Sequence, residues 1–220
     1  MTRAVAERSD DVEFRRCRVD PVVAAEFPGL SLWATTVADA VVGRTPPEIR
    51  ERLGMLADRL HGAEAVALRT RPIPHAYRVL FRQLGLDPDI ARTPLEALVL
   101  ERLMRGGARS HGMPDDALAL AILETGVPVS ALDGARVHGA IGLRPAVDGE
   151  RLDAVAIPAG RLVVADEHGP CAVLFGATGR RPARGTTAVL LVAIQAPGVP
   201  DTAVDEALWI AADAIRAAGS

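Results

Sequence analysis

The side chains that carry familiar enzyme chemistry are scattered in this sequence. The histidines, common ligands of transition metals, show no pairing at helical or strand spacing: His61, His75, His111, His138 and His168. Cys17 and Cys171 are solitary and far apart, so they match neither a redox motif nor a zinc motif. No serine stands between glycines at the spacing of a nucleophile elbow. The residues therefore predict neither a metal site nor a serine-hydrolase centre.

Two further patterns suggest a phosphate-binding loop and paired catalytic carboxylates, but neither has the required context. The Gly-Ala-Thr-Gly segment at 176–179 is too short for a P-loop or a dinucleotide fingerprint, and it follows a predicted strand without opening a helix. The carboxylate pairs at 115–116 and 205–206 stand at predicted helix starts, where acidic side chains favour the helix dipole. No cofactor is predicted, and these patterns identify no catalytic residue.

Arginine is the only one of the two strongly basic residue types, Lys and Arg, in this sequence. All 25 such residues are arginines, and the sequence contains neither Lys nor Asn. A GC-rich coding sequence explains this bias without selection for RNA. A guanidinium nevertheless makes bidentate contacts with phosphate that Lys cannot make. Five arginines are candidates for phosphate contact, with a solvated role as the alternative: Arg92, Arg109, Arg180, Arg181 and Arg184.

The composition predicts a globular protein without a strong electrostatic field. With 220 residues, 49% hydrophobic and 24% charged, the chain can bury a substantial core, and one domain is the default. The formal net charge of −3 provides no general attraction to nucleic acid, so any RNA contact must be local and DNA is not expected. No apolar run approaches the roughly 18 residues that span a bilayer, so we expect a cytoplasmic protein without a membrane partner. The oligomeric state cannot be read from the sequence.

Hydrophobic periodicity predicts helices first and strands later. Residues 1–20 form a polar lead-in, 30–42 is predicted to be a strand, and a C-terminal helix begins at Asp201. Helices are predicted at about 47–60, 74–84, 94–105 and 115–125. Short β-rich segments follow Gly139 at 140–144, 151–157, 162–165, 171–175 and 187–194. This grouping favours an α+β fold.

Local signals refine this prediction. Thr45 with Glu48 and Thr93 with Glu96 each match a capping box, with Pro at the first helical positions. The cap explains the second motif without any ligand. The glycine-rich and arginine-rich segment 176–185 is predicted to be a mobile surface loop.

Five blocks between residues 76 and 194 follow one another in a recognisable order. They are AYRVLFRQLGLDPDIARTPLEALVLERLMRGG at 76–107, LETGVPVSALD at 123–133, IGLRPAVDGERL at 141–152, LVVADEHGPCAVLFGATG at 162–179 and TTAVLLVAI at 186–194. Together they resemble the B3/B4 domain of the phenylalanyl-tRNA synthetase beta subunit. They resemble still more closely the small stand-alone proteins that carry this domain alone.

The resemblance implies a single B3/B4-type α+β domain over residues 1–220, with its family-like core at about 76–195 and a mixed or antiparallel sheet in the second half. The synthetase domain hydrolyses tyrosine wrongly attached to phenylalanine tRNA, because one binding pocket cannot discriminate well enough between similar side chains. The resemblance thus implies a tRNA-binding protein, and an aminoacyl-tRNA hydrolase acting in trans on the charged 3′ end. The alternative is a non-catalytic module that binds RNA, a small molecule or a protein partner.

The family's site positions carry over with changed residues. Ser130 stands where the family has a histidine implicated in editing, and it is the one candidate for a catalytic role. Val192 stands where the family has the acidic residue that reads the tyrosine hydroxyl. Gly176 and Thr186 match a pocket glycine and the first Thr of the following strand. These four residues and Arg144, on a predicted strand that faces solvent or the cleft, form the expected substrate pocket. Backbone amides near Gly176 are the expected donors to an oxyanion.

Overall fold

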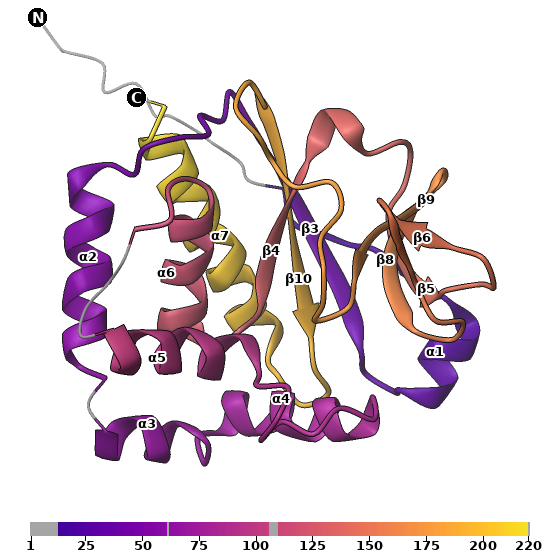
Figure 1. Ribbon diagram of the computed structural model, residues 1–220, viewed down its shortest axis with the longest axis horizontal. Helices are drawn as coiled ribbons and strands as arrows, with labels where there is room; N and C mark the ends of the chain where they lie inside the picture. The colour runs from indigo at the N-terminus through magenta and orange to yellow at the C-terminus, as the bar shows by residue number, and fades with distance from the viewer. Residues whose placement is uncertain (1–12, 61, 106–109, 220) are drawn as a thin grey trace, which may run out of the picture.

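The computed structural model describes residues 13–60, 62–105 and 110–219, which contain two four-stranded sheets and a small hairpin (Figure 1). The first sheet is antiparallel and has the strand order β1 (Arg15–Arg16), β3 (Ser31–Ala38), β10 (Ala188–Gln195) and β4 (Val129–Asp133). The second has the order β2 (Arg18–Val19), β5 (Gly142–Pro145), β8 (Leu162–Asp166) and β9 (Gly169–Val173). Only its β2–β5 pair is parallel. The hairpin pairs β6 (Arg151–Leu152) with β7 (Val155–Ala156).

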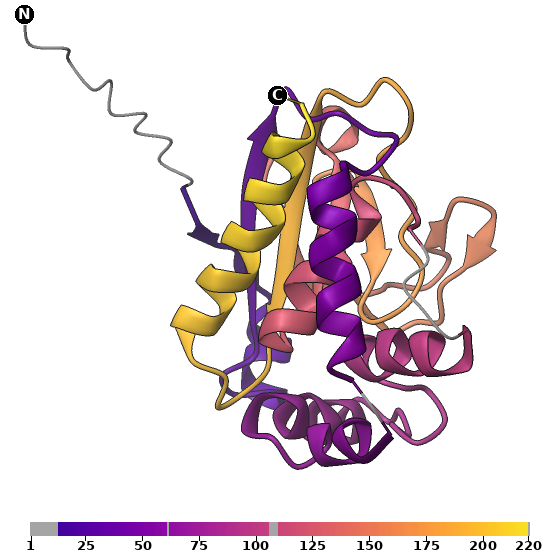
Figure 2. The same ribbon diagram turned by 90° about the vertical axis from the view of Figure 1, so that its left-hand side faces the viewer.

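The described helices are α1 (Pro21–Glu26), α2 (Pro47–Asp58), α3 (Gly62–Leu68), α4 (Pro72–Gln83), α5 (Pro94–Arg105), α6 (Asp115–Thr125), the short η1 (Gly134–Arg136) and α7 (Asp201–Ala217). Helices α2 to α7 cover one face and one end of the first sheet, and the second sheet lies beyond its other face, with α1 beside β5 (Figure 1). Helix α7 runs along the sheet beside β10, as Figure 2 shows, and α6 packs against both α7 and β4. None of the described helices is both long and apolar enough to cross a membrane.

Strand β10 is the centre of the fold because both its edges are paired and both its faces are covered. Its sequence, AVLLVAIQ, is apolar up to the last residue, and only Ala188 escapes full burial. Val192 pairs with Ala34 of β3 on one side and with Ser130 of β4 on the other. Directly paired residues point to the same face of a sheet, so Val192 and Ser130 share a face.

Several sequence predictions are confirmed. The fold is α+β with a C-terminal helix, and α6 has the predicted bounds. The capping box at the start of α5 forms as expected: the Thr93 amide donates to Glu96 Oε2 over 3.2 Å and the Glu96 amide to Thr93 Oγ1 over 3.4 Å. Residues 15–19, within the predicted polar lead-in, contribute β1 and β2 to the sheets.

The predicted cap at Thr45 is wrong. Helix α2 starts at Pro47 without any side-chain cap, and the Thr45 hydroxyl donates instead to Asp116 Oδ2 over 2.5 Å. Asp116 is 1% exposed, and a buried carboxylate is costly unless donors satisfy it. The Ser110 hydroxyl and the His111 amide also donate to this carboxylate. The tertiary demand of Asp116 therefore outweighs the local capping pattern.

Candidate functional site

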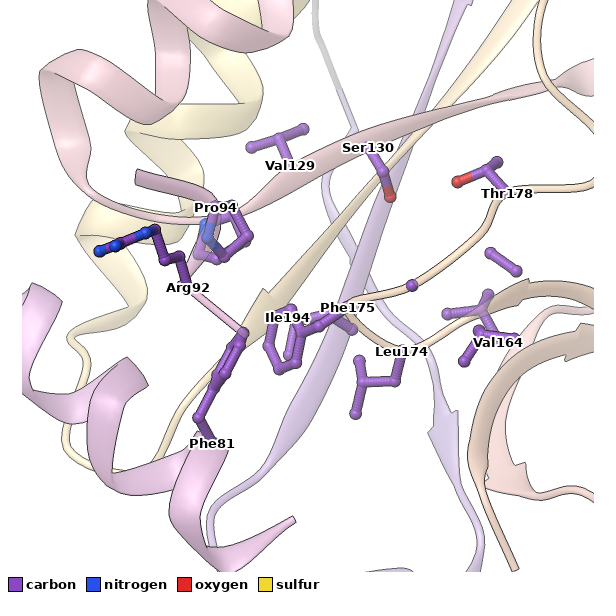
Figure 3. A pocket seen from close by; sticks show the side chains of 14 residues that line it. Phe81, Arg92, Pro94, Val129, Ser130, Val164, Leu174, Phe175, Thr178 and Ile194 are labelled. Carbon is purple, nitrogen blue, oxygen red and sulfur yellow. The ribbon is translucent and has the colours of Figure 1, made fainter. Parts of the chain in front are cut away.

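A cavity of about 250 Å³ opens between β4 and the chain that follows β9 (Figure 3). Ser130 of β4 lines one side, and Gly176 and Thr178 line the other. Apart from Arg92, its remaining walls are apolar and include Phe81 of α4, Val164 of β8, Leu174, Phe175 and Ile194. Among the described lining residues, no carboxylate, histidine or cysteine is present.

Two hydroxyls give the cavity its polar centre. Ser130 and Thr178 are both half-buried, and Figure 3 shows their oxygens directed into the space between β4 and the Thr178 segment. Neither hydroxyl has a hydrogen-bond partner among the described residues. They can therefore donate to, or accept from, a bound ester, amide or water.

The turn at Phe175 and Gly176 shapes the cavity floor. Phe175 has a positive φ of 52°, a conformation that costs free energy for a non-glycine residue, and its ring packs on Phe81 with centroids 4.7 Å apart. A Cβ on Gly176 would lie 3.0 Å from Val173 Cγ1, so the close approach favours glycine. The Gly176 amide donates to the Val173 carbonyl over 2.9 Å. This amide is therefore engaged in the turn, so an oxyanion donor near Gly176 would be one of the neighbouring amides.

Arg92 lies at the rim of the cavity, just before α5. Its side chain is half-buried and has no hydrogen-bond or ion-pair partner among the described residues. In Figure 3 the guanidinium points away from Ser130. The stem thus lines the cavity, while the charged group lies beyond its rim and is free to contact an anion.

The other predicted pocket residues lie outside the lining. Val192 shares the face of Ser130 but is 1% exposed, packed between β3 and β4, and Ile194 on the same face reaches the cavity instead. The Thr186 hydroxyl donates to Asp133 Oδ2 over 2.9 Å, outside the cavity. Arg144 of β5 lies on the second sheet, paired with Glu150 over 2.6 Å.

Two of the predicted tRNA-contact arginines are engaged within the protein. Arg180 donates to the buried Asp166 carboxylate and, over 2.7 Å, to the Arg136 carbonyl. Arg181 pairs with Asp115 over 2.9 Å. These contacts hold the 176–185 segment against the fold. They oppose the mobility predicted for this loop. Arg184 is exposed, and Arg109 lies outside the described residues.

The Arg180–Asp166 pair is the most strongly perturbed charge near the site. Burial alone would raise the pKa of Asp166, whose side chain is 0% exposed. The Arg180 guanidinium and the amides of His138 and His168 outweigh burial and lower this pKa to about 2. The carboxylate therefore fastens the loop after β9 to the second sheet.

This pKa predicts a loss of stability in acid. A lowered folded-state pKa stabilises the fold above the unfolded value of about 3.9, and the stabilisation disappears as pH falls toward 2. Between pH 5 and pH 2 we expect wild type to lose about 2 kcal/mol more unfolding free energy than Asp166→Asn. Urea denaturation at several pH values measures this difference. Asp115→Asn, in an exposed pair, is the control and should keep the wild-type slope; an equal slope in Asp166→Asn would contradict the assignment.

Thr178, Phe81 and Phe175 were not predicted as site residues. Phe81 fits the apolar stripe of its helix, which favours a core role, and Phe175 fits a strand. Thr178 lies in a glycine-flanked segment that was considered only as a phosphate loop. The described residues also contain no group of three or more His, Cys, Asp or Glu placed to hold a metal ion.

Comparison with known proteins gives partial similarities. No family model matches the chain. It is 38% identical to the phenylalanine–tRNA ligase beta subunit of Streptomyces avermitilis over 91 residues, which are 39% of this chain and 11% of that subunit. It is 30% identical to the same subunit of Nocardia farcinica over 139 residues, 60% of this chain and 16% of the subunit.

A third similarity is to a protein of another kind. The signal recognition particle receptor FtsY of Deinococcus radiodurans is 29% identical over 180 residues, 80% of this chain and 52% of the receptor. The ligase beta subunits of several organisms match this chain over shorter segments and at higher identity. This chain therefore spans only a small fraction of the beta subunits it matches, and over roughly 40 to 60% of its own length it is similar to the beta subunit of phenylalanine–tRNA ligase.

Proposed function

We propose that this protein is a B3/B4-type domain that binds the aminoacylated 3′ end of a tRNA in the Ser130–Thr178 cavity. The observation that carries the proposal is the pair of unpartnered hydroxyls facing a largely apolar cavity. The similarity to a tRNA ligase subunit supports RNA as the ligand. Arg92, at the approach to the cavity, is the phosphate contact nearest to it.

The chemistry that this cavity supports best is hydrolysis of the aminoacyl ester. Ser130 and Thr178 would hold the ester and a water molecule, and would stabilise the oxyanion that forms when the water attacks the carbonyl carbon. The bond from this carbon to the ribose oxygen would then break, and the ribose oxygen would leave as a hydroxyl after taking up the proton that the water gives off. The apolar walls would take the amino-acid side chain. Since the described residues that line the cavity include no general base, rate enhancement would come from positioning and electrostatic stabilisation.

A non-catalytic role is the second candidate, and a specific feature favours it. The described lining residues have no imidazole or carboxylate that could take a proton from water near neutral pH. In this case the domain would hold the charged end without releasing the amino acid. Incubation with tRNAs mischarged with several amino acids separates the candidates: release above the spontaneous rate supports the hydrolase, and binding without release supports the holder.

Binding of tRNA itself is tested through Arg92. We expect Arg92→Ala to weaken tRNA binding and to reduce the slope of log K against log salt by about 1, because one phosphate contact is lost. Gel retardation across a salt series measures both effects. Arg50→Ala, an exposed arginine on α2, is the matched control and should behave as wild type. Absence of tRNA binding to the wild type even at low salt would refute the proposed function.

A further inference from the structure

The cavity lies where the edges of two sheets separate. After β9 the chain turns back, and residues 177–179 run beside it as an added edge: the Val173 amide donates to the Ala177 carbonyl over 2.8 Å and the Gly179 amide to the Cys171 carbonyl over 3.0 Å. This added edge faces β4, the outer strand of the first sheet. The two edges therefore face each other across a gap.

The gap is closed at one end and open at the other. The Asp133 amide at the end of β4 donates to the Arg180 carbonyl over 2.7 Å, which joins the two edges there. Toward Ser130 and Thr178 no such bond forms among the described residues, and the cavity occupies the space between the strands. A sheet that would otherwise be continuous is thus interrupted at the site.

The open edge of β4 presents free main-chain groups. The Ile194 amide donates to the Pro128 carbonyl over 3.3 Å, so Pro128 faces β10, whereas the Asp133 amide faces the opposite side. Because main-chain groups alternate along a strand, the N–H and C=O groups of Val129 and Ala131 face the gap side with Asp133. Neither residue has a partner for these groups among the described residues.

The facing edge is arranged in the same way. Thr178 forms a bridge with Ala172 in which the neighbouring residues 177 and 179 carry the hydrogen bonds. The N–H and C=O groups of Thr178 consequently point away from β9. Val129 has its side chain directed away from Ser130 in Figure 3, which fits a main-chain contribution from Val129 to the cavity wall.

We propose that the ligand binds here as a short added strand along β4, with its amino group donating to the Val129 carbonyl and its own carbonyl accepting from the Ala131 amide. This inference rests on the proposed function for naming its occupant, the aminoacyl group of the charged tRNA end. Strand addition supplies affinity through the main chain and leaves selectivity to the pocket that receives the side chain. Here that pocket is apolar, with Phe81, Phe175 and Ile194 among its walls.

The charges of the cavity define the class of occupant further. Since no carboxylate is found among the described residues that line the cavity, an α-amino group would meet main-chain carbonyls and not an ion-pair partner. The preferred aminoacyl group therefore has an apolar side chain, and acylation of its nitrogen should not weaken binding. A tyrosine hydroxyl has no charged acceptor in this lining, since the position of Val192 is apolar and packed away.

Amide hydrogen exchange on the ¹⁵N-labelled full chain tests this arrangement without tRNA. The probe is N-acetyl-L-valine methylamide, which carries a main chain and an apolar side chain without charge. At ten times its Kd, exchange of the Ala131 amide, which donates to the carbonyl of the probe, is expected to slow by about tenfold. The amides of Ser130 and Leu132 face β10 and serve as internal controls whose exchange should not change.

Other outcomes overturn the inference. Absence of probe binding, or binding that leaves the Ala131 amide exchanging as in the free protein, refutes strand addition. As a variant, Ala131→Pro removes an outward N–H without removing a bond to β10, and it should lower probe affinity about tenfold if folded. If it does not fold, the exchange data on wild type decide. Edge protection by the probe without any tRNA binding would refute only the proposed function.

Discussion

Replacing Arg78 with methionine is expected to lower the free energy of unfolding by about 3 kcal/mol. The Arg78 side chain, on α4, is 8% exposed and donates to Glu96 Oε1 over 2.5 Å and to Asp89 Oδ1 over 2.8 Å. The Glu96 side chain is 9% exposed, so the substitution would leave a buried carboxylate with less compensation. Arg69 remains 3.4 Å from Glu96 and keeps the effect at the lower end of its class.

This interaction also positions the cavity. Arg78 is three residues before Phe81, and Glu96 lies within the first turn of α5, beside Arg92 and Pro94. The ion pair therefore fixes the helix that carries an aromatic wall against the helix start that carries the cavity rim. Arg78→Met should perturb ligand binding at the site as well as the stability of the fold.

Urea denaturation at neutral pH measures the loss. Arg82→Met, an exposed arginine on the same helix, is the matched control and should change the free energy by less than about 0.5 kcal/mol. Adding Glu96→Gln to Arg78→Met should recover part of the loss, because the unpaired charge is then removed. If Arg78→Met and Arg82→Met have equal stability, the pair does not have the structural role assigned to it.

The second large effect concerns the two hydroxyls. If release from mischarged tRNA is observed for wild type, Ser130→Ala combined with Thr178→Val is expected to lower its rate by about 100-fold. The reason is that both groups are the unpartnered donors in the cavity centre, and neither is used to hold the fold among the described residues. The melting temperature should consequently stay close to that of wild type.

The measurement is single-turnover release of the amino acid, which separates chemistry from binding. Thr36→Val, at an exposed position on β3, removes a hydroxyl outside the cavity and is the matched control. A double variant that releases the amino acid as fast as the control would exclude these hydroxyls from the reaction. A double variant that loses tRNA binding but not release would assign them to binding alone.

The sequence by itself determined the elements whose signals are local. The capping box at Thr93 and Glu96 forms because both partners lie within one turn of the same helix start. Helix α6 ends where the sequence has Gly126, which adopts the left-handed conformation at the C-terminus of the helix. The apolar run of β10 likewise predicts a strand. A central strand is buried on both faces, so all its side chains tend to be apolar.

Tertiary structure decided how these elements serve a site. Thr45 matches a cap in sequence but donates to Asp116, 71 residues away, because the buried carboxylate needs its hydroxyl. Strand β4 was missed because its five residues, VSALD, are too few to show a clear alternation of apolar and polar side chains. Its pairing with β10 stabilises it as a strand. The cavity between Ser130 and Thr178 depends on two sheet edges that separate in space. No local sequence pattern predicts this separation, because the sequence does not show which main-chain N–H and C=O groups lack a neighbouring strand.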